Sequence, residues 1–202
     1  MTRSTRRVVL TAAYLLHHRP WRDTSRILEV LTREHGRLTL FARGVRGANA
    51  KLAPVLQPFQ LLLKLTTRHD ALPELFDHYH RTLEQLRSGA PLEPALRVFE
   101  KRLLEVLGYG LDLATEARSG LPLEPDAYYD FHPGVGLLPA RGSSVRALYG
   151  HSLLSLARES LRGERELEDA RRVLTAALGA CLEGRPLSTR LVARAMKRGA
   201  SP

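Results

Sequence analysis

The chain has 202 residues, and 44% of them are apolar, so it can form one medium domain or two small domains with a hydrophobic core. Lysine and arginine number 31 against 21 acidic residues, and the resulting formal charge of +10 favours a polyanionic partner, first of all nucleic acid. The sequence has no apolar stretch of the roughly 20 residues that span a membrane and no secretory signal after Met1, so we expect a cytoplasmic protein without a membrane partner.

The first sixty residues have the composition of β-strands. Residues 7–17 and 24–32 are rich in Val, Leu, Ile and Tyr, and the segment 19–23 between them contains a proline and predicts a hairpin turn. A glycine turn at 34–37 then leads into a third strand over 38–43. In this strand an apolar set of side chains alternates with a basic and aromatic set, namely Leu38, Leu40 and Ala42 against Arg37, Thr39, Phe41 and Arg43.

From Leu72 onward, the spacing of the apolar residues is helical. It predicts an irregular stretch over 108–142 and, on either side of it, helices over 72–86, 96–107, 145–161 and 167–181. A last segment, 188–197, has the composition of a short basic helix.

Together these patterns predict an α+β protein. Residues 1–60 are expected to form a small N-terminal OB-like β-barrel, and residues 61–202 a mostly α-helical C-terminal domain. The glycine-containing stretch 44–51 is expected to be a surface loop of the β-module. An OB barrel binds single strands by stacking bases on aromatic side chains inside a cationic groove, which agrees with the charge of the chain.

DNA binding requires cations that contact phosphates and flat side chains that stack on bases. The first candidate group lies on the third strand, the loop after it and the neighbouring hairpin, and consists of Arg22, Arg26, Arg37, Phe41, Arg43, Arg46 and Lys51. The second shares one face of the C-terminal segment if that segment is helical, and consists of Arg190, Arg194 and Lys197.

Each group has an alternative interpretation. Phe41 would pack under the helical domain, with the arginines around it only solvated. The C-terminal cations would form a frayed, solvated tail, or bind an acidic peptide with a hydrophobic end, such as the tail of single-strand-binding protein.

We find no catalytic or metal-binding pattern in the sequence. The histidines are scattered, and the spacing of His78 and His80 points the two imidazoles to different sides of a helix. The single cysteine, Cys181, lies in an apolar helical pattern and is expected to be a buried, inert thiol. No nucleotide-binding glycine loop occurs. We therefore expect a protein that is not an enzyme and needs neither a metal nor another cofactor.

Several stretches, taken together, resemble the RecO family of bacterial DNA repair and recombination proteins. In the first half they are AYLLHHRPWRDTS at 13–25, LTREHGR at 31–37, FARGVR at 41–46 and LQPF at 56–59. The second half adds FEKRLLEVLGY at 99–109 and GRPLSTR at 184–190. Their order and spacing over nearly the whole chain identify it as a member of this family.

The resemblance implies a function that the residue patterns alone do not give. It implies an OB fold and a helical domain that together bind single- and double-stranded DNA and anneal complementary strands, in a cytoplasmic, nucleoid-associated protein. With its partner RecR, such a protein helps RecA to replace single-strand-binding protein on gapped DNA. The competing hypothesis is a protein-interaction scaffold whose truncated barrel no longer binds DNA.

The chain departs from the family pattern in two places. Many members carry a four-cysteine zinc site in the region that matches residues 113–129, where this sequence has no cysteine. In addition, Leu61–Tyr79 resembles a helical-domain sequence that other members carry well downstream of the LQPF strand, whereas here Gln60 joins the two directly. Either the last strands of the barrel are deleted, or residues 59–66 serve as a strand. The deletion would impair folding or DNA affinity.

Overall fold

The structure is a computed structural model that describes residues 11–21, 25–42, 59–140 and 147–182. The chain divides into two compact units, Met1–Asp77 and His78–Pro202. The domain boundary that the sequence predicts after residue 60 stays a prediction, because compactness does not test independent folding.

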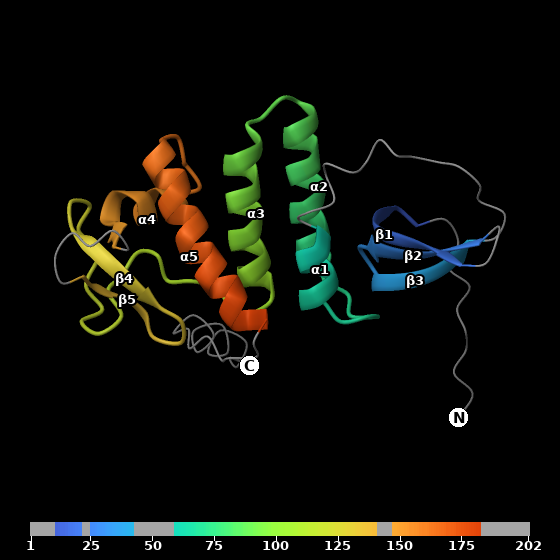
Figure 1. Cartoon of the computed structure of the whole chain (residues 1–202), viewed down its shortest axis with the longest axis horizontal. Helices are drawn as coiled ribbons and strands as arrows, with labels where there is room; N and C mark the ends of the chain where they lie inside the picture. The colour runs from blue at the N-terminus through green and yellow to red at the C-terminus, as the bar shows by residue number, and fades with distance from the viewer. Residues whose placement is uncertain (1–10, 22–24, 43–58, 141–146, 183–202) are drawn as a thin grey trace, which may run out of the picture. The chain divides into compact units, whose positions relative to one another are not determined.

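In the first unit, three antiparallel strands form a sheet in the order β1-β2-β3 (Figure 1). β1 is Ala13–Trp21, β2 is Ser25–Thr32 and β3 is Gly36–Ala42. The predicted antiparallel strands are therefore confirmed. Among the described residues the sheet stays open and does not close into a barrel.

β1 extends further along the chain than the sequence predicted. Residues 19–21, which the sequence assigned to a turn, pair with β2, and Trp21 lies opposite Ser25 while Pro20 lies opposite Arg26. The proline is tolerated because, among the residues that the structure describes, β1 is an edge strand that pairs with β2 alone, and an edge strand can hold a residue without an N–H. As a result, Trp21 projects from the sheet and not from a loop.

The segment that the sequence left with two alternatives is a helix, α1, which spans Phe59–Leu65. The strand alternative for residues 59–66 is therefore wrong. The physical reason is local, because leucine, glutamine and lysine are strong helix formers and the segment contains no β-branched residue before Thr66. α1 packs against β1, and Leu62 on this helix is fully buried.

The helix α2, Pro73–Arg87, begins with a proline at its first position, where the missing N–H is not needed. Its early residue Phe76 packs on Tyr14 of β1, with 5.2 Å between the ring centroids. A bulge in β1 places an extra residue, Leu16, into this core with 1% of its surface exposed.

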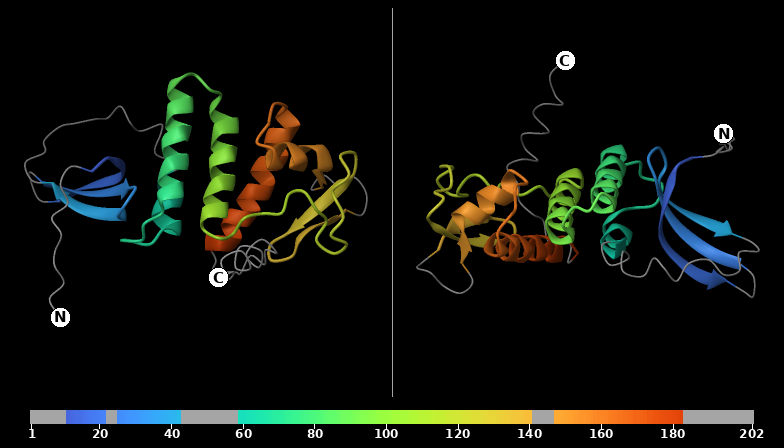
Figure 2. Two further views of the ribbon diagram at one scale, coloured as in Figure 1. Left: turned by 180° about the vertical axis from the view of Figure 1, so that it is seen from behind. Right: turned by 90° about the horizontal axis from the view of Figure 1, so that it is seen from above.

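The second unit is mainly helical, with α3 at Leu92–Val106, α4 at Gly150–Ala157 and α5 at Glu164–Leu182. α3 and α5 lie side by side in both views of Figure 2, and Leu103 of α3 and Leu174 of α5 are fully buried. The helices predicted over 72–86, 96–107 and 167–181 are confirmed within a few residues.

A second sheet corrects two predictions. β4 (Tyr128–His132) pairs with β5 (Gly136–Pro139) and with β6 (Leu148–Tyr149) inside stretches that were predicted to be irregular or helical. These strands are too short to show a clear two-residue period. The helix predicted over 145–161 is correspondingly shorter, since α4 begins at Gly150.

Residues 113–129, which match the four-cysteine zinc site of many members of the family that the sequence resembles, contain no cysteine. Two carboxylates close the loop in this region. Asp112 accepts hydrogen bonds from the backbone N–H groups of Ala114 and Thr115, and Glu116 accepts hydrogen bonds from those of Arg118 and Ser119. In the part of the chain that the structure describes, no group of His, Cys, Asp and Glu side chains is arranged to hold a metal ion. No described helix is both long and apolar enough to cross a bilayer.

Candidate nucleic-acid interface

One face of the first sheet carries an exposed aromatic pair next to a polar cluster. The strand register places Phe41, Thr39 and Arg37 of β3 on the same face as Glu29 of β2. At one end of this face, Trp21 meets Phe41 edge to face, with ring centroids 6.4 Å apart. Trp21 is 44% exposed and Phe41 is 50% exposed. We call the surface made by Trp21, Phe41, Thr39, Glu29 and Arg37 the aromatic face.

Sequence reasoning missed Trp21, because the proline before it suggested a turn. Two features of the sequence could have indicated Trp21. It is the single tryptophan of the chain, and the proline before it is compatible with an edge strand. Two exposed aromatic rings that meet from the two outer strands, β1 and β3, suit the stacking of unpaired bases.

Glu29 is the centre of the polar cluster on the aromatic face. Its carboxylate accepts hydrogen bonds from Thr39 Oγ1 and Arg68 Nη2, both at 2.8 Å, and its Oε2 lies 3.9 Å from Nε of Arg37. Burial by itself would raise the pKa of Glu29, but the hydrogen bonds from Thr39 and Arg68 and the charges of Arg68 and Arg37 outweigh it and lower the pKa. The carboxylate therefore stays ionised and holds two guanidinium groups.

Arg37 occupies a different environment from the one that the sequence predicted. The alternation in β3 placed it on an exposed basic face, but its side chain is only 13% exposed, lies beside Glu29 and donates to the carbonyl oxygen of Leu63. The correction has a tertiary cause, since α1 covers this end of the face. A contact between Arg37 and DNA stays a prediction.

The opposite face of the sheet also differs from the prediction. Leu38, Leu40 and Ala42 were expected to form a buried apolar face, yet Leu40 is 44% exposed and Leu15 on β1 is 39% exposed. On this face the described residues bury the end around Val30, whose partner is Leu38, and leave the end around Leu40 exposed.

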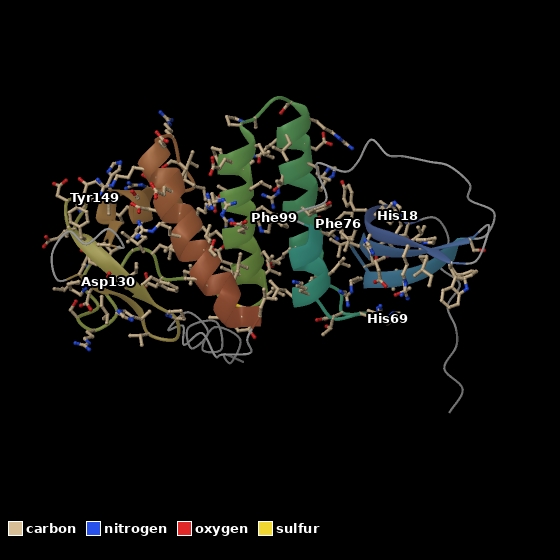
Figure 3. The ribbon with its side chains drawn as sticks, viewed as in Figure 1. His18, His69, Phe76, Phe99, Asp130 and Tyr149 are labelled. Atoms are coloured by element: carbon tan, nitrogen blue, oxygen red, sulfur yellow. The ribbon has the colours of Figure 1, made fainter. Side chains whose placement is uncertain are left out.

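The segment between α1 and α2 is fixed against the start of β3. Arg68 forms a parallel bridge with Arg37, and the N–H of the following residue, His69, donates to the Arg37 carbonyl oxygen at 3.0 Å. His69 is labelled in Figure 3. Next to it, Gly36 has a φ of 63° and lies against the backbone of Asp70. This segment brings Arg68, which is 56% exposed and which the sequence did not single out, to the aromatic face.

Most of the predicted DNA-binding residues lie outside the described part of the chain. The backbone of Arg26 belongs to β2, but its side chain is not described. Outside the described ranges are Arg22, Arg43, Arg46, Lys51, Arg190, Arg194 and Lys197. The structure therefore brings together two of the predicted residues, Phe41 and Arg37, on one face.

Cys181 near the end of α5 is partly buried. Burial raises the pKa of its thiol to about 11, so the thiol stays protonated at neutral pH and is a poor nucleophile. This agrees with the inert thiol that the sequence predicted.

Replacing Glu29 with glutamine is expected to lower the free energy of unfolding of the first unit by about 1 kcal/mol at neutral pH, because charged hydrogen bonds become neutral ones. Since the folded pKa of Glu29 lies below its ordinary value of 4.5, its contribution is complete above that value and is lost as the pH falls through the folded pKa. The difference between wild type and Glu29→Gln should therefore shrink in acid.

Urea titrations that follow the fluorescence of Trp21 at several pH values measure this difference. Glu34→Gln removes an exposed carboxylate from the turn after β2 and serves as the control. An equal loss of stability in both variants, or a loss in Glu29→Gln that does not change with pH, contradicts the prediction.

Two family models match this chain and together span most of it. "Recombination protein O N terminal" matches residues 7–76, and "Recombination protein O C terminal" matches residues 59–190. Proteins named "DNA repair protein RecO" are similar over nearly their whole length. The relative from Methylococcus capsulatus is 35% identical over 91% of this chain and 92% of its own, and that from Coxiella burnetii (strain RSA 493) is 34% identical over 92% and 98%.

The comparisons also bear on the deletion that the sequence suggested. The alignment with the Methylococcus protein spans 224 positions, which is more than the 202 residues of the whole chain, so that relative contains residues that this chain lacks. Residues 59–76 are matched by both family models, and this shared segment contains the junction at Gln60. From the family models and these relatives, we conclude that the chain belongs to the RecO family of DNA repair and recombination proteins.

Proposed function

We propose that this protein binds single- and double-stranded DNA in the cytoplasm, in association with the nucleoid, and anneals complementary strands without catalytic turnover. Together with RecR it helps RecA to replace single-strand-binding protein on gapped DNA. Its membership in the RecO family supports the role in repair, and the aromatic face of the first unit supports direct contact with DNA.

The distribution of charge favours the first unit as the main DNA-binding surface. Residues 1–77 contain 13 lysines and arginines against 6 acidic residues, whereas residues 78–182 contain 13 against 14. The C-terminal residues 183–202 are again basic, with 5 against 1. Phosphate binding through release of counterions requires such an excess of positive charge. Residues 78–182, which lie between these two segments, have no excess of positive charge.

The single observation that carries the proposal is the exposed contact between Trp21 and Phe41 in the unit with the largest positive charge. Stacking on an aromatic side chain contributes about 1 to 3 kcal/mol per base. It requires an unpaired base whose flat face is not already covered by a neighbouring base. We propose that phosphates are bound around this pair by the predicted residues Arg22, Arg26, Arg37, Arg43, Arg46 and Lys51, and in the tail by Arg190, Arg194 and Lys197.

The experiment that tests the proposal measures DNA affinity against ionic strength. Binding of an oligo-dT strand is expected to quench the fluorescence of Trp21, and its affinity should fall steeply as salt rises, by a slope of about 0.7 per phosphate contact in a logarithmic plot. The double variant Arg43→Ala, Arg46→Ala should weaken binding and reduce that slope by roughly 1.4. A strand of the same length with abasic sites should bind more weakly and quench less.

The alternative is the protein-interaction scaffold, in which the shortened β-module no longer contacts DNA. The open sheet and the extra residues in the relative favour this alternative. A scaffold shows no salt-dependent binding and no quenching of Trp21, even at low salt. Breakdown of labelled DNA would contradict both functions, because neither includes an enzymatic step.

A further inference from the structure

We propose that Arg68, held over the aromatic face by Glu29, is a phosphate-binding residue of the DNA site, with Glu29 as its positioning residue. The inference rests on the proposed DNA-binding function. It adds a cation from the segment between α1 and α2, which carries none of the predicted DNA-binding residues.

The backbone under Arg68 is fixed at two successive points. The bridge to Arg37 and the hydrogen bond from His69 to the Arg37 carbonyl oxygen join the segment to the start of β3. Two residues further along, the backbone of Asp70 packs closely against Gly36, which gives the segment a second fixed point. The position of Arg68 relative to the sheet is therefore set by backbone contacts and does not depend on its own side chain.

The guanidinium of Arg68 is held at one end and exposed at the other. Its Nη2 donates to Glu29 Oε1 at 2.8 Å, and the Glu29 side chain is only 11% exposed, whereas that of Arg68 is 56% exposed. A guanidinium carries several further N–H donors in a planar fork that matches the oxygens of a phosphate. Because the side chain is already ordered, less conformational entropy is lost when a phosphate binds.

The charges around Arg68 leave it attractive to an anion. Glu29 lies between two guanidinium groups, those of Arg68 and Arg37, so its one negative charge cannot neutralise both. The other carboxylate of the segment, Asp70, accepts a hydrogen bond from Thr67 Oγ1 at 3.3 Å. No ion pair joins Asp70 to Arg68 among the described residues.

Arg68 lies on the same face as the aromatic pair. Its partner Glu29 is paired with Thr39, and Phe41 is two residues further along β3, a step of about 7 Å. A short single strand that stacks a base on Trp21 or Phe41 therefore has a neighbouring phosphate within reach of Arg68.

The chain offers a matched control in Arg33. Its side chain is 54% exposed, close to the exposure of Arg68, and it also belongs to the first unit and pairs with a carboxylate. The difference is that both Nε and Nη2 of Arg33 bond to Asp77, at 2.9 and 3.0 Å, so the fork that would bind a phosphate is occupied. Arg33→Gln and Arg68→Gln remove the same charge from the same unit.

The test compares the salt dependence of oligo-dT binding in the full chain for wild type, Arg68→Gln and Arg33→Gln. Arg68→Gln is expected to weaken binding several-fold and to reduce the slope of the logarithmic salt plot by about 0.7, whereas Arg33→Gln leaves the slope unchanged. Arg68→Lys keeps the charge and should restore the slope. Equal slopes for the two glutamine variants overturn the proposal.

A second measurement uses the wild-type protein and so does not depend on the folding of a variant. Phenylglyoxal modifies exposed arginines, and mass spectrometry of the peptides gives the rate at each site. Oligo-dT should slow the modification of Arg68 and leave that of Arg33 unchanged, and equal rates at Arg68 with and without DNA overturn the proposal. If DNA binding persists and depends on Arg43 and Arg46 but not on Arg68, only this inference fails; if no DNA binds at all, the proposed function fails with it.

Discussion

Replacing Gly36 with alanine is expected to destabilise the first unit by roughly 3 kcal/mol. Gly36 has a φ of 63°, which costs a residue with a Cβ about 1 kcal/mol. A Cβ built at this position would lie 1.8 Å from the Asp70 carbonyl oxygen and 2.5 Å from its carbonyl carbon, and backbone atoms cannot yield as a flexible side chain does. The segment after α1 must then separate from β3, and this overpacking adds about 2 kcal/mol.

A urea titration followed by the fluorescence of Trp21 measures this loss, because the single tryptophan lies in the first unit. Gly89→Ala is the control, and far-UV circular dichroism follows it because Gly89 lies in the second unit. Gly89 also has a positive φ, of 90°, but a Cβ there would meet no atom within 4 Å. The control isolates the backbone strain from the clash. If both variants lose the same stability in their own units, the contact between Gly36 and Asp70 is not what holds the segment.

Replacing Lys101 with methionine is expected to destabilise the second unit by about 2 kcal/mol. The side chain of Lys101 is 8% exposed, and its Nζ lies 2.9 Å from both Glu105 and Glu159. Removing one partner of a buried ion pair costs more than the pair contributes, because the remaining charge is left without compensation. We expect less than the usual 3 to 5 kcal/mol, since Arg102 still pairs with both carboxylates and these are partly exposed.

Far-UV circular dichroism in urea follows the helices of the second unit and measures the change. Arg87→Met removes a cation whose partner, Glu84, lies on the same helix and whose side chain is 71% exposed, so its stability should be nearly unchanged. If Lys101→Met is as stable as wild type, methionine packs well enough in that site to replace the ion pair. If Arg87→Met loses as much as Lys101→Met, the effect comes from charge alone and not from burial.

The helices were predictable because each buries one stripe of apolar side chains, which leaves a clear period over fifteen or more residues. The strands β4, β5 and β6 have five, four and two residues and are too short for any such period. The residues on either side of Gly134 pair with each other, but no local pattern in the sequence showed this pairing.

For the candidate site, the sequence identified Phe41 and the general excess of cations. It missed Trp21, because local turn chemistry around Pro20 conflicted with a strand that only its pairing with β2 stabilises. It placed Arg37 on an exposed face, because alternation along one strand cannot show that a helix covers that end. Arg68 could not be found at all, since it is 39 residues from Glu29 in the sequence.

By itself, the sequence determined the α+β class, the helices of the second unit, the concentration of positive charge in the first unit and the resemblance to the RecO family, since these depend on composition, local periodicity and residue identity. Only the tertiary structure decided that residues 59–65 are a helix beside an open sheet and that Glu29, Arg37 and Arg68 share one cluster. It also decided that Trp21 and Phe41 meet on the same face. The physical reason is that strand pairing and burial join residues that are distant in the chain, and no local pattern records those contacts.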